Sequence, residues 1–452
     1  MAFTAPFLFA LSTCTVGTAH PYTTINSAVS SGCTIINIDC PSGICTYTEN
    51  IAPTSATLDL HKVGAGTVVI DGGSLPALTI DGTQTILDGI DELTGVSGAI
   101  VEIKGGGTLS MTGSPGQYAY IRGVRPNTTG VSLRGDAFAH FNGVSIDSHS
   151  TGLELTVLPN VNAPSVELEA SVLASNDLAL KSGGCATCTQ PSISVFSKLL
   201  MGSPSTANSY IADNDAVLET RVPTQATFSH VLVFRNAALG GPAVPMVSIS
   251  DGSSLVLENT LVDDNDLTPG TDMLGAAPGN VLFELHDGVA QINVINSTIA
   301  RNTNRPVFDW SFLASPASTV LVEGSVITEN DRPFSHSKLP GSACGNMNVA
   351  NTIFFGNTGG IGVSYPSPPC GIPFIAHNPG LQRVFFPIPP SLMAPFAPLP
   401  GAPEAPYLEQ WTPFAAPIPF GPATLYPGPF MWGINGAGPD TGNLDVGYHW
   451  GT

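Results

Sequence analysis

Carboxylate side chains occur in three short clusters of the sequence. These clusters are Glu167/Glu169, Asp213/Asp215 and Asp263/Asp264/Asp266. Two carboxylates that converge in a groove can act as the acid and the base of glycoside cleavage. Carboxylates are also oxygen ligands that Ca²⁺ prefers. We interpret the clusters as solvated faces, and two further hypotheses stay open: Glu167 and Glu169 as one wall of a saccharide cleft, and the Asp263 cluster as a calcium site.

The nine histidines are scattered along the chain. Four of them lie in or beside the repeats described below, without the spacing of metal ligands: His140, His230, His286 and His336. The sequence also lacks a Gly-x-Ser-x-Gly motif, a phosphate-binding loop and a dinucleotide fingerprint. It therefore assigns no catalytic, cofactor-binding or metal-binding residue, and calcium is the one cofactor that it leaves open.

Eight cysteines form four pairs with short spacings, which are Cys14 with Cys33, Cys40 with Cys45, Cys185 with Cys188, and Cys344 with Cys370. An even number at such spacings is typical of disulfides in an oxidising compartment, although eight cysteines allow 105 pairings. Cys185 and Cys188 also match a redox or zinc motif, but no second cysteine or histidine pair lies nearby. We predict a secreted or cell-surface protein with disulfides.

Composition excludes several classes of protein. Fourteen basic residues against 34 acidic ones give a net charge of −20, whereas a nucleic-acid binder needs a basic footprint. Hydrophobic residues make up 42% of the chain and charged residues only 11%, which argues against charge-driven disorder. The many glycines and prolines disfavour long helices. No apolar run is long enough to predict a membrane span.

A seven-residue string recurs along the middle of the chain. Its final Asn or Ser falls at positions 148, 176, 203, 236, 265, 302, 330 and 357, so the basic period is 27 to 29 residues. A β-rich unit of this length cannot bury its apolar face alone, but stacked units share a continuous core. The repeat predicts a solenoid of parallel strands, and residues 51–140 continue it with less regular units.

The last position of the unit is expected to form a ladder inside the solenoid. The ladder residues would be Asn176, Ser203, Asn236, Asn265, Asn302, Asn330 and Asn357, stacked at a tight bend and bonded to their neighbours. One position earlier, the charges alternate in sign, which predicts a surface charge ladder of Arg235, Asp264, Arg301 and Glu329.

Two longer steps in the repeat predict loop insertions around 204–228 and 267–289. Loops that project from a solenoid usually define its binding face. These segments contain an aromatic ring, acidic residues and a histidine, namely Tyr210, Asp213, Asp215, Met273 and His286. We interpret them as a candidate sugar-binding surface.

The two ends of the chain differ from its middle. Residues 1–13 form an apolar segment that is either a signal remnant or an assembly strand, and residues 14–50 form an N-terminal cap. The solenoid is expected over 51–382. Residues 383–452 contain 15 prolines and three of the four tryptophans, so they predict a Pro/aromatic-rich C-terminal cap wrapped over the solenoid.

The chain resembles the right-handed parallel β-helix proteins of the pectin-lyase-like superfamily, particularly secreted bacterial members with loose repeats. The resemblance lies in Cys14–Thr18, Tyr22–Gly32 and Gly43–Ile51, in the repeat with its terminal Asn, and in the closing motifs 378–381 and 440–448. It implies an N-terminal cap with a helix at about 22–31, and an all-β, single-stranded solenoid. One fold of this kind hosts many activities.

The catalytic signatures of this superfamily do not carry over. Of the polygalacturonase motifs only Asp263-Asp264 is present, and the chain contains no Gln-Asp dipeptide like those of the pectin methylesterases. The candidate bases of a pectate lyase are Arg122, Arg125 and Arg134, which lie near Asp136 without a recognisable spacing. Enzymatic activity is therefore left open, with a non-catalytic role favoured.

We expect an extracellular structural or adhesive protein that self-associates or contacts a cell surface or glycan. In the sharper version of this hypothesis it forms filaments through its terminal segments, with residues 1–11 joining the next molecule. One alternative is a polysaccharide lyase or glycoside hydrolase of pectin-lyase-like fold. The other is a glycan-binding surface module.

Overall fold

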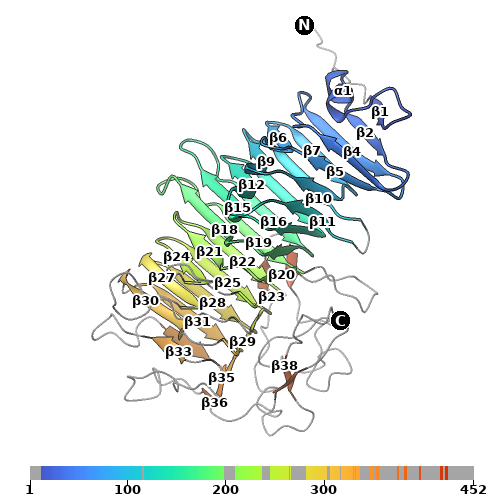
Figure 1. The fold of residues 1–452 in the computed structure, drawn as a ribbon. Helices are drawn as coiled ribbons and strands as arrows, with labels where there is room; N and C mark the ends of the chain where they lie inside the picture. Colours follow the sequence, from blue (N-terminus) through green and yellow to red (C-terminus); the bar gives the residue numbers. More distant parts are fainter. Residues whose placement is uncertain are drawn as a thin grey trace.

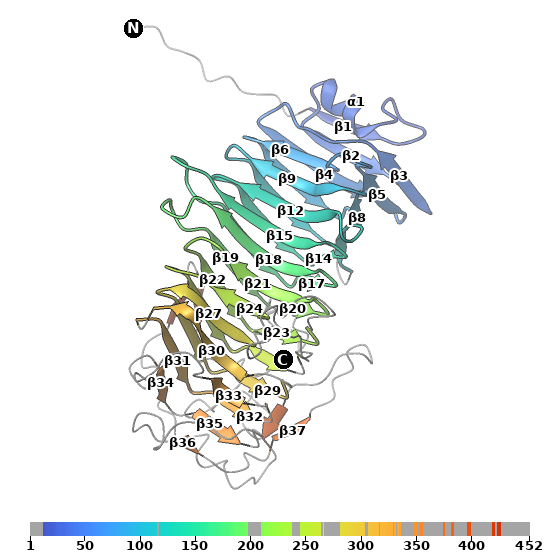
Figure 2. The same cartoon turned by 60° about the vertical axis from the view of Figure 1, so that its left-hand side comes forward.

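The structure is a computed structural model of the 452-residue chain. The residues it describes are 12–114, 117–197, 209–236, 245–263, 265, 281–302, 306–315, 317–328, 330, 332–335, 347–350, 352–355, 374–375, 381–383, 396–398, 418–420 and 423–425. Within these residues, the chain winds in coils that stack into one elongated rod (Figures 1 and 2). Each full coil adds one strand to each of three parallel sheets, here called A, B and C.

Sheets A and B each contain 13 described strands. In order along sheet A, they are β1 (Thr13–Val16), β2 (Ile35–Asp39), β4 (Thr57–Val63), β7 (Gln84–Asp88), β10 (Thr108–Thr112), β13 (Phe138–Asn142), β16 (Ser165–Glu169), β19 (Ser192–Phe196), β22 (Gln225–Ser229), β25 (Ser254–Glu258), β28 (Gln291–Ile295), β31 (Thr319–Glu323) and β34 (Met347–Ala350). In order along sheet B, they are β3 (Ile44–Thr48), β5 (Thr67–Asp71), β8 (Glu92–Thr94), β11 (Ala119–Arg122), β14 (Val144–Asp147), β17 (Val172–Ala174), β20 (Ser209–Ala212), β23 (Val231–Phe234), β26 (Leu261–Asp263), β29 (Thr298–Ala300), β32 (Val326–Thr328), β35 (Thr352–Phe355) and β36 (Phe374–Ile375).

Sheet C contains ten described strands. They are β6 (Leu78–Asp81), β9 (Gly98–Lys104), β12 (Thr128–Arg134), β15 (Thr151–Val157), β18 (Leu178–Gly184), β21 (Ala216–Thr220), β24 (Val247–Ile249), β27 (Phe283–Gly288), β30 (Pro306–Ala314) and β33 (Arg332–Ser335). Two antiparallel pairs follow in the chain, β37 (Leu381–Arg383) with β38 (Phe396–Pro398), and β39 (Ile418–Phe420) with β40 (Ala423–Leu425). The three long parallel sheets confirm the predicted parallel β-helix.

Along each strand, side chains point alternately into and out of the rod. At each inward position, the residues of successive coils form an apolar column. In sheet A, one such column is Leu60, Leu87, Met111, Phe141, Leu168, Val195, Phe228, Leu257, Val294 and Val322, all of them buried. In sheet C, the rings of Phe283 and Phe308 stack at 5.4 Å between centroids. The core is therefore shared between neighbouring coils, as a solenoid requires.

The chain turns between sheets through single residues in the left-handed backbone region. At the corner between sheets A and B these residues are Gly143, Ala170, His230, Asn259, Asn296 and Gly324, and at the corner between sheets B and C they are Ser148, Ser175, Asp213, Arg235 and Arg301. One left-handed residue bends the chain sharply, so each of these corners passes from one sheet to the next within a few residues.

A buried asparagine ladder follows the corner between sheets B and C. The backbone N–H of each ladder residue donates to Oδ1 of the next, at 2.9–3.2 Å, and the side-chain Nδ2 makes the same step at 2.8–3.0 Å. The described members are Asn176, Asn214, Asn236, Asn265, Asn302 and Asn330. Asn357 lies outside the described residues.

The predicted ladder position at Ser203 lies outside the described residues, and Asn214 stands between Asn176 and Asn236 in the ladder. Residues 198–208 separate β19 from β20, so the turn of that coil comes 38 residues after Asn176 rather than 27. One coil before Asn176, the N–H of His149 donates to Asn176 Oδ1, and Ser148 is the left-handed corner residue.

A short helix, α1 (Ile25–Ser30), lies at the N-terminal end of the rod (Figure 1), within the range that the resemblance implies. Ile25, Ala28 and Val29 face the core. The disulfide Cys14–Cys33 ties β1 to the residues after the helix. The boundary residues 1–11 lie outside the described part, as do most of 383–452, so the predicted C-terminal wrap remains a prediction.

Candidate functional site

The outer face of sheet C carries a column of polar side chains in register from coil to coil. We call it the sheet-C column, and its members are Glu102, Ser132, Glu154, Lys181, Glu219, Ser248, Glu284 and Asp309. From Glu102 to Glu284, a carboxylate recurs at every second coil, with a shorter or basic side chain between. Because adjacent strands lie about 4.8 Å apart, these carboxylates repeat at about 9.6 Å.

Most carboxylates of the sheet-C column hold a basic side chain two residues further along the chain. Arg221 Nε lies 2.6 Å from Glu219 Oε1, His286 Nδ1 lies 3.0 Å from Glu284 Oε2, and Lys104 Nζ lies 3.6 Å from Glu102 Oε2. Glu154 instead contacts Lys181 of the next coil at 2.9 Å. The hydrogen bond with Glu284, and the charges of Asp287 and Glu219, raise the pKa of His286.

A cavity of about 650 Å³ lies over this column between Glu219 and Glu284. Ser248 lies between these two carboxylates in the register, and Pro245 and Leu178 add apolar surface. Its charged lining groups include Asp177, Glu219, Glu284 and Asp287 against Arg221 and His286. The site is therefore a net acidic hollow that combines apolar surface with hydroxyl, guanidinium and imidazole donors along its walls.

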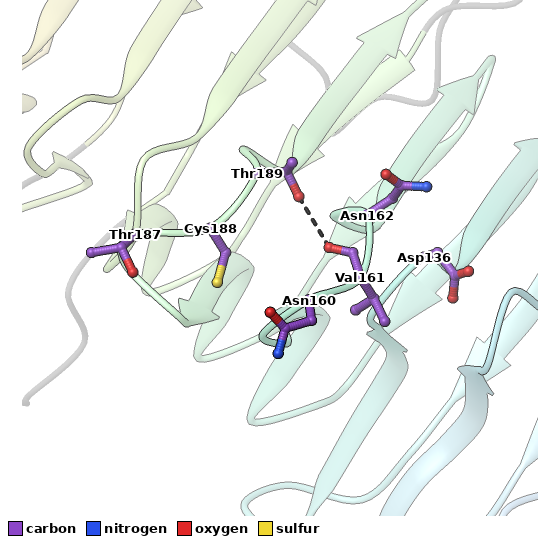
Figure 3. Close-up of a pocket in the computed structure, with 7 residues that line it drawn as sticks. All are labelled: Asp136, Asn160, Val161, Asn162, Thr187, Cys188 and Thr189. Atoms are coloured by element: carbon purple, nitrogen blue, oxygen red, sulfur yellow. Dashed lines mark hydrogen bonds between the residues drawn. The ribbon is translucent and has the colours of Figure 1, made fainter.

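A second hollow, of about 580 Å³, lies among the loops that connect sheet C to sheet A (Figure 3). Its lining residues are Asp136, Asn160, Val161, Asn162, Thr187, Cys188 and Thr189. Thr189 Oγ1 donates to the carbonyl oxygen of Val161 at 3.3 Å. Cys188 is bonded to Cys185, so the sulfurs of this motif are engaged in a disulfide.

The cysteines form the three short-range disulfides that their spacing suggests. They are Cys14–Cys33, Cys40–Cys45 and Cys185–Cys188, and no described cysteine is free. The fourth predicted pair, Cys344 with Cys370, lies outside the described residues.

The acidic clusters of the sequence do not meet in the sheet-C cavity. Glu167 and Glu169 do share the outer face of β16, where His140 Nε2 lies 3.6 Å from Glu169 Oε2. Asp213 pairs with Arg235 at 2.6 Å, and Asp215 lies 4.0 Å from Arg125. Glu169, Asp213 and Asp215 therefore face basic side chains at separate places on the rod.

Asp263 is buried and pairs with Arg301 of the next coil through two hydrogen bonds, one of them 2.9 Å from Nε to Oδ1. Arg301 is only 8% exposed, so its predicted place in a surface charge ladder is wrong. Asp264, Asp266 and Glu329 lie outside the described residues. Because the Asp263 carboxylate is paired with Arg301 inside the rod, it is not free to be a ligand of the calcium ion hypothesised for this cluster.

The three arginines considered as lyase bases are likewise paired. Arg122 contacts Asp147 at 3.0 Å, and its guanidinium lies 4.6 Å from the centroid of the Tyr120 ring. Arg125 contacts Asp177 at 3.1 Å. Arg134 lies 4.0 Å from Glu102.

The first predicted insertion is displaced along the chain, whereas most of the second, 267–280, lies outside the described residues. Residues 209–212, 216–220 and 225–229 are ordinary strands, and the extra residues of that coil are 198–208. Tyr210 lies in β20, edge-to-face with Phe234 at 6.2 Å, and so belongs to sheet B rather than to a loop. His286 lies in β27 and does line the cavity, whereas Met273 falls outside the described residues.

Sequence reasoning missed Glu219 and Glu284, although a signal was present. Glu-x-Lys, Glu-x-Arg and Glu-x-His occur at 102–104, 219–221 and 284–286, and the glutamate of each motif lies in a strand of sheet C. Alternation places both side chains of such a motif on one face. The irregular coil lengths hide the fact that these motifs stack.

Among the described residues, no three His, Cys, Asp or Glu side chains lie close enough together to hold a metal ion. The same residues contain no helix that is long and apolar enough to span a bilayer. Comparisons with family models, with curated proteins and with solved structures found no significant match.

Proposed function

We propose that this protein is an extracellular adhesive β-helix, of the pectin-lyase-like kind, that binds a neutral polysaccharide along the outer face of sheet C. The observation that carries the proposal is the cavity between Glu219 and Glu284, set in a column whose carboxylates repeat every second coil. A repeating polymer fits a repeating surface, because each sugar unit then meets the same side chains.

The spacing and chemistry of the sheet-C column suit a chain of sugars. Its repeat of about 9.6 Å approximates the length of a disaccharide. Carboxylates accept hydrogen bonds from sugar hydroxyls, and such charge-assisted bonds are stronger than neutral ones. Ser248, Arg221 and His286 supply donors beside them. An excess of carboxylates, on a chain of net charge −20, disfavours polymers of uronic acids.

The extracellular location is proposed from the disulfides. Three of them occur among the described residues, and such bonds persist in oxidising compartments. They support a secreted or cell-surface protein and do not distinguish between the two.

The binding proposal is tested by electrophoresis through gels that contain a soluble neutral polysaccharide, such as a galactomannan, a xyloglucan or a mixed-linkage glucan. We expect at least one of these polymers to retard the protein. Glu219→Ala and Glu284→Ala should each weaken the retardation about tenfold, since a hydrogen bond to a charged group contributes about 1.5–3 kcal/mol.

Glu167→Ala is the matched control, because Glu167 lies on the outer face of sheet A, away from the cavity. Its retardation should equal that of the unchanged protein. Retardation by polygalacturonate alone, retardation by none of the gels, or variants at Glu219 and Glu284 that migrate like the control would each contradict the proposal.

A hydrolase is the second candidate, favoured by the two carboxylates that face the same cavity. Their strands are two spacings apart, about 9.6 Å, and the carboxylates of inverting glycosidases are about 6.5–9.5 Å apart. The test is whether the protein releases reducing ends from a polymer that it binds. Release that is abolished in Glu284→Ala would favour the hydrolase over the adhesive protein.

Self-association into filaments remains a proposal for the N-terminal end. Among the described strands, β1 is the end strand of sheet A, and residues 1–11 directly precede it. An edge strand offers unpaired backbone groups to another chain. We expect negative-stain electron microscopy to show filaments of the full chain and separate rods after deletion of residues 1–11. Filaments that persist after the deletion would rule out this segment as the joint.

A further inference from the structure

The corner between sheets A and B holds three buried oxygen atoms that have no hydrogen-bond partner among the described residues. They are Oε2 of Glu258, Oδ1 of Asn259 and Oδ1 of Asn296. The three side chains are only 2%, 4% and 4% exposed, respectively. Buried acceptors without a partner are rare and costly in folded proteins, so each of them requires an explanation.

The left-handed backbone at this corner explains in part why asparagine occurs there. Asn259 and Asn296 have φ of 45° and 48°, and asparagine enters this left-handed region more readily than most residues. Gly143 and Gly324 hold the same corner in other coils. This preference accounts for asparagine at the corner, but it does not account for amide oxygens turned away from solvent beside a buried carboxyl group.

Register brings the three residues together. Glu258 and Asn259 are consecutive, and Glu258 pairs with Ile295 of the next coil, which places Asn259 opposite Asn296. Neighbouring strands lie about 4.8 Å apart, so a single ion between the two coils is within reach of all three side chains. A buried carboxylate needs a counter-charge, and a bound cation would supply it.

We propose that Glu258, Asn259 and Asn296 are ligands of a Ca²⁺ ion at the corner between sheets A and B. A carboxylate and neutral amide oxygens are the ligand types that Ca²⁺ takes, in flexible arrangements of six to eight oxygens that backbone carbonyls and water complete. The ion would join the coil of β25 to the coil of β28. This site is separate from Asp263, whose carboxylate is committed to Arg301.

The test uses the full chain, stripped of metal with a chelator and titrated with CaCl₂ in a calorimeter. The main variant is the double substitution Asn259→Gly and Asn296→Gly, which removes two ligands. It suits the backbone, because glycine already occupies this corner at positions 143 and 324. Asn160→Gly is the matched control, since Asn160 also has a left-handed backbone, with φ of 64°, but is exposed.

We expect the unchanged protein and the control to bind one more equivalent of Ca²⁺ than the double variant, and CaCl₂ to raise their melting temperature more. Glu258→Gln, which keeps the shape of the side chain, should lose the same equivalent. The proposal is overturned if the unchanged protein binds no Ca²⁺, if the double variant binds as many equivalents as the unchanged protein, or if Asn160→Gly loses the equivalent too.

Discussion

Each asparagine of the ladder satisfies several backbone groups that the solenoid would otherwise leave unpaired. The Asn236 side chain accepts the N–H of Asn214 and donates to the carbonyl oxygens of Ile211 and Phe234. A buried polar group without a partner costs about 1–3 kcal/mol, so the ladder residues must match this pattern of donors and acceptors. A serine has one hydroxyl and could not replace both halves of the amide.

His149 takes the ladder position in the coil before Asn176 and gives the fold a pH-dependent element. Its ring is fully buried, with Nε2 3.0 Å from the carbonyl oxygen of Ile121 and Nδ1 3.0 Å from Thr128 Oγ1. Desolvation lowers its pKa, against smaller opposing effects of Ile121 and Asp147. The neutral ring is therefore the form that the folded state favours.

We expect His149 to reduce stability as the solution becomes acidic. Below about pH 6.5 the unfolded chain protonates this histidine before the folded chain does, so the free energy of unfolding falls until the lowered folded pKa is passed. Above pH 6.5 the contribution is constant. Urea denaturation between pH 8 and 5 should show this loss in the unchanged protein and not in His149→Asn. Parallel pH curves for the two proteins would contradict the expectation.

The ladder also shows which single-residue positions can be predicted from the sequence. Five of the seven predicted positions are in the observed ladder: Asn176, Asn236, Asn265, Asn302 and Asn330. Ser203 lies outside the described residues, and Asn214 takes the place between Asn176 and Asn236, which the irregular length of that coil hides in the sequence. Only the pairing of Val172 with Tyr210 places Asn214 beside Asn176.

At the scale of elements, α1 depends on a residue from the coil that follows it. The carboxylate of Glu49 accepts hydrogen bonds from the N–H groups of Ile25 and Asn26, both at 2.8 Å. The first N–H groups of a helix have no partner within it, and a carboxylate there also interacts favourably with the helix dipole. Glu49 therefore fixes the cap to the first coil.

Glu49→Ala should destabilise the cap by about 2 kcal/mol, because two helix N–H groups lose a charged acceptor. Hydrogen–deuterium exchange is the suitable measurement, since it resolves segments of the chain. We expect faster exchange over α1 and β1, and unchanged exchange over β10 and β13. Equal acceleration along the whole rod, or none at α1, would show that this contact does not hold the cap.

The elements also explain why the sequence does not predict the sheet-C cavity as a site. Glu219 and Glu284 are 65 positions apart in the sequence and two coils apart in sheet C. Alternation within each strand can be read from the residues, and so can the parallel stacking. The number of residues in each corner loop cannot be read from the sequence. This number decides which strands bring their carboxylates to the same cavity.

At the scale of the whole molecule, each coil contacts mainly its neighbours, so stability is close to a sum of local terms. Two described disulfides, Cys14–Cys33 and Cys40–Cys45, lie in the first coils, whereas Cys185–Cys188 closes a loop between β18 and β19. A disulfide acts largely by restricting the unfolded chain between and around its cysteines. The cross-links therefore strengthen the N-terminal end more than the middle of the rod.

Reduction with dithiothreitol should for this reason loosen the rod from one end. We expect hydrogen–deuterium exchange to accelerate over residues 12–50, where two disulfides and α1 hold the cap, and to remain unchanged over β22, β25 and β28. Those strands are held by inward residues such as Phe228 and Leu257, and their coils are joined by the ladder, which reduction does not touch. Exchange that accelerates equally in all coils would mean that the rod unfolds as one cooperative unit, and the one-dimensional description of its stability would then be wrong.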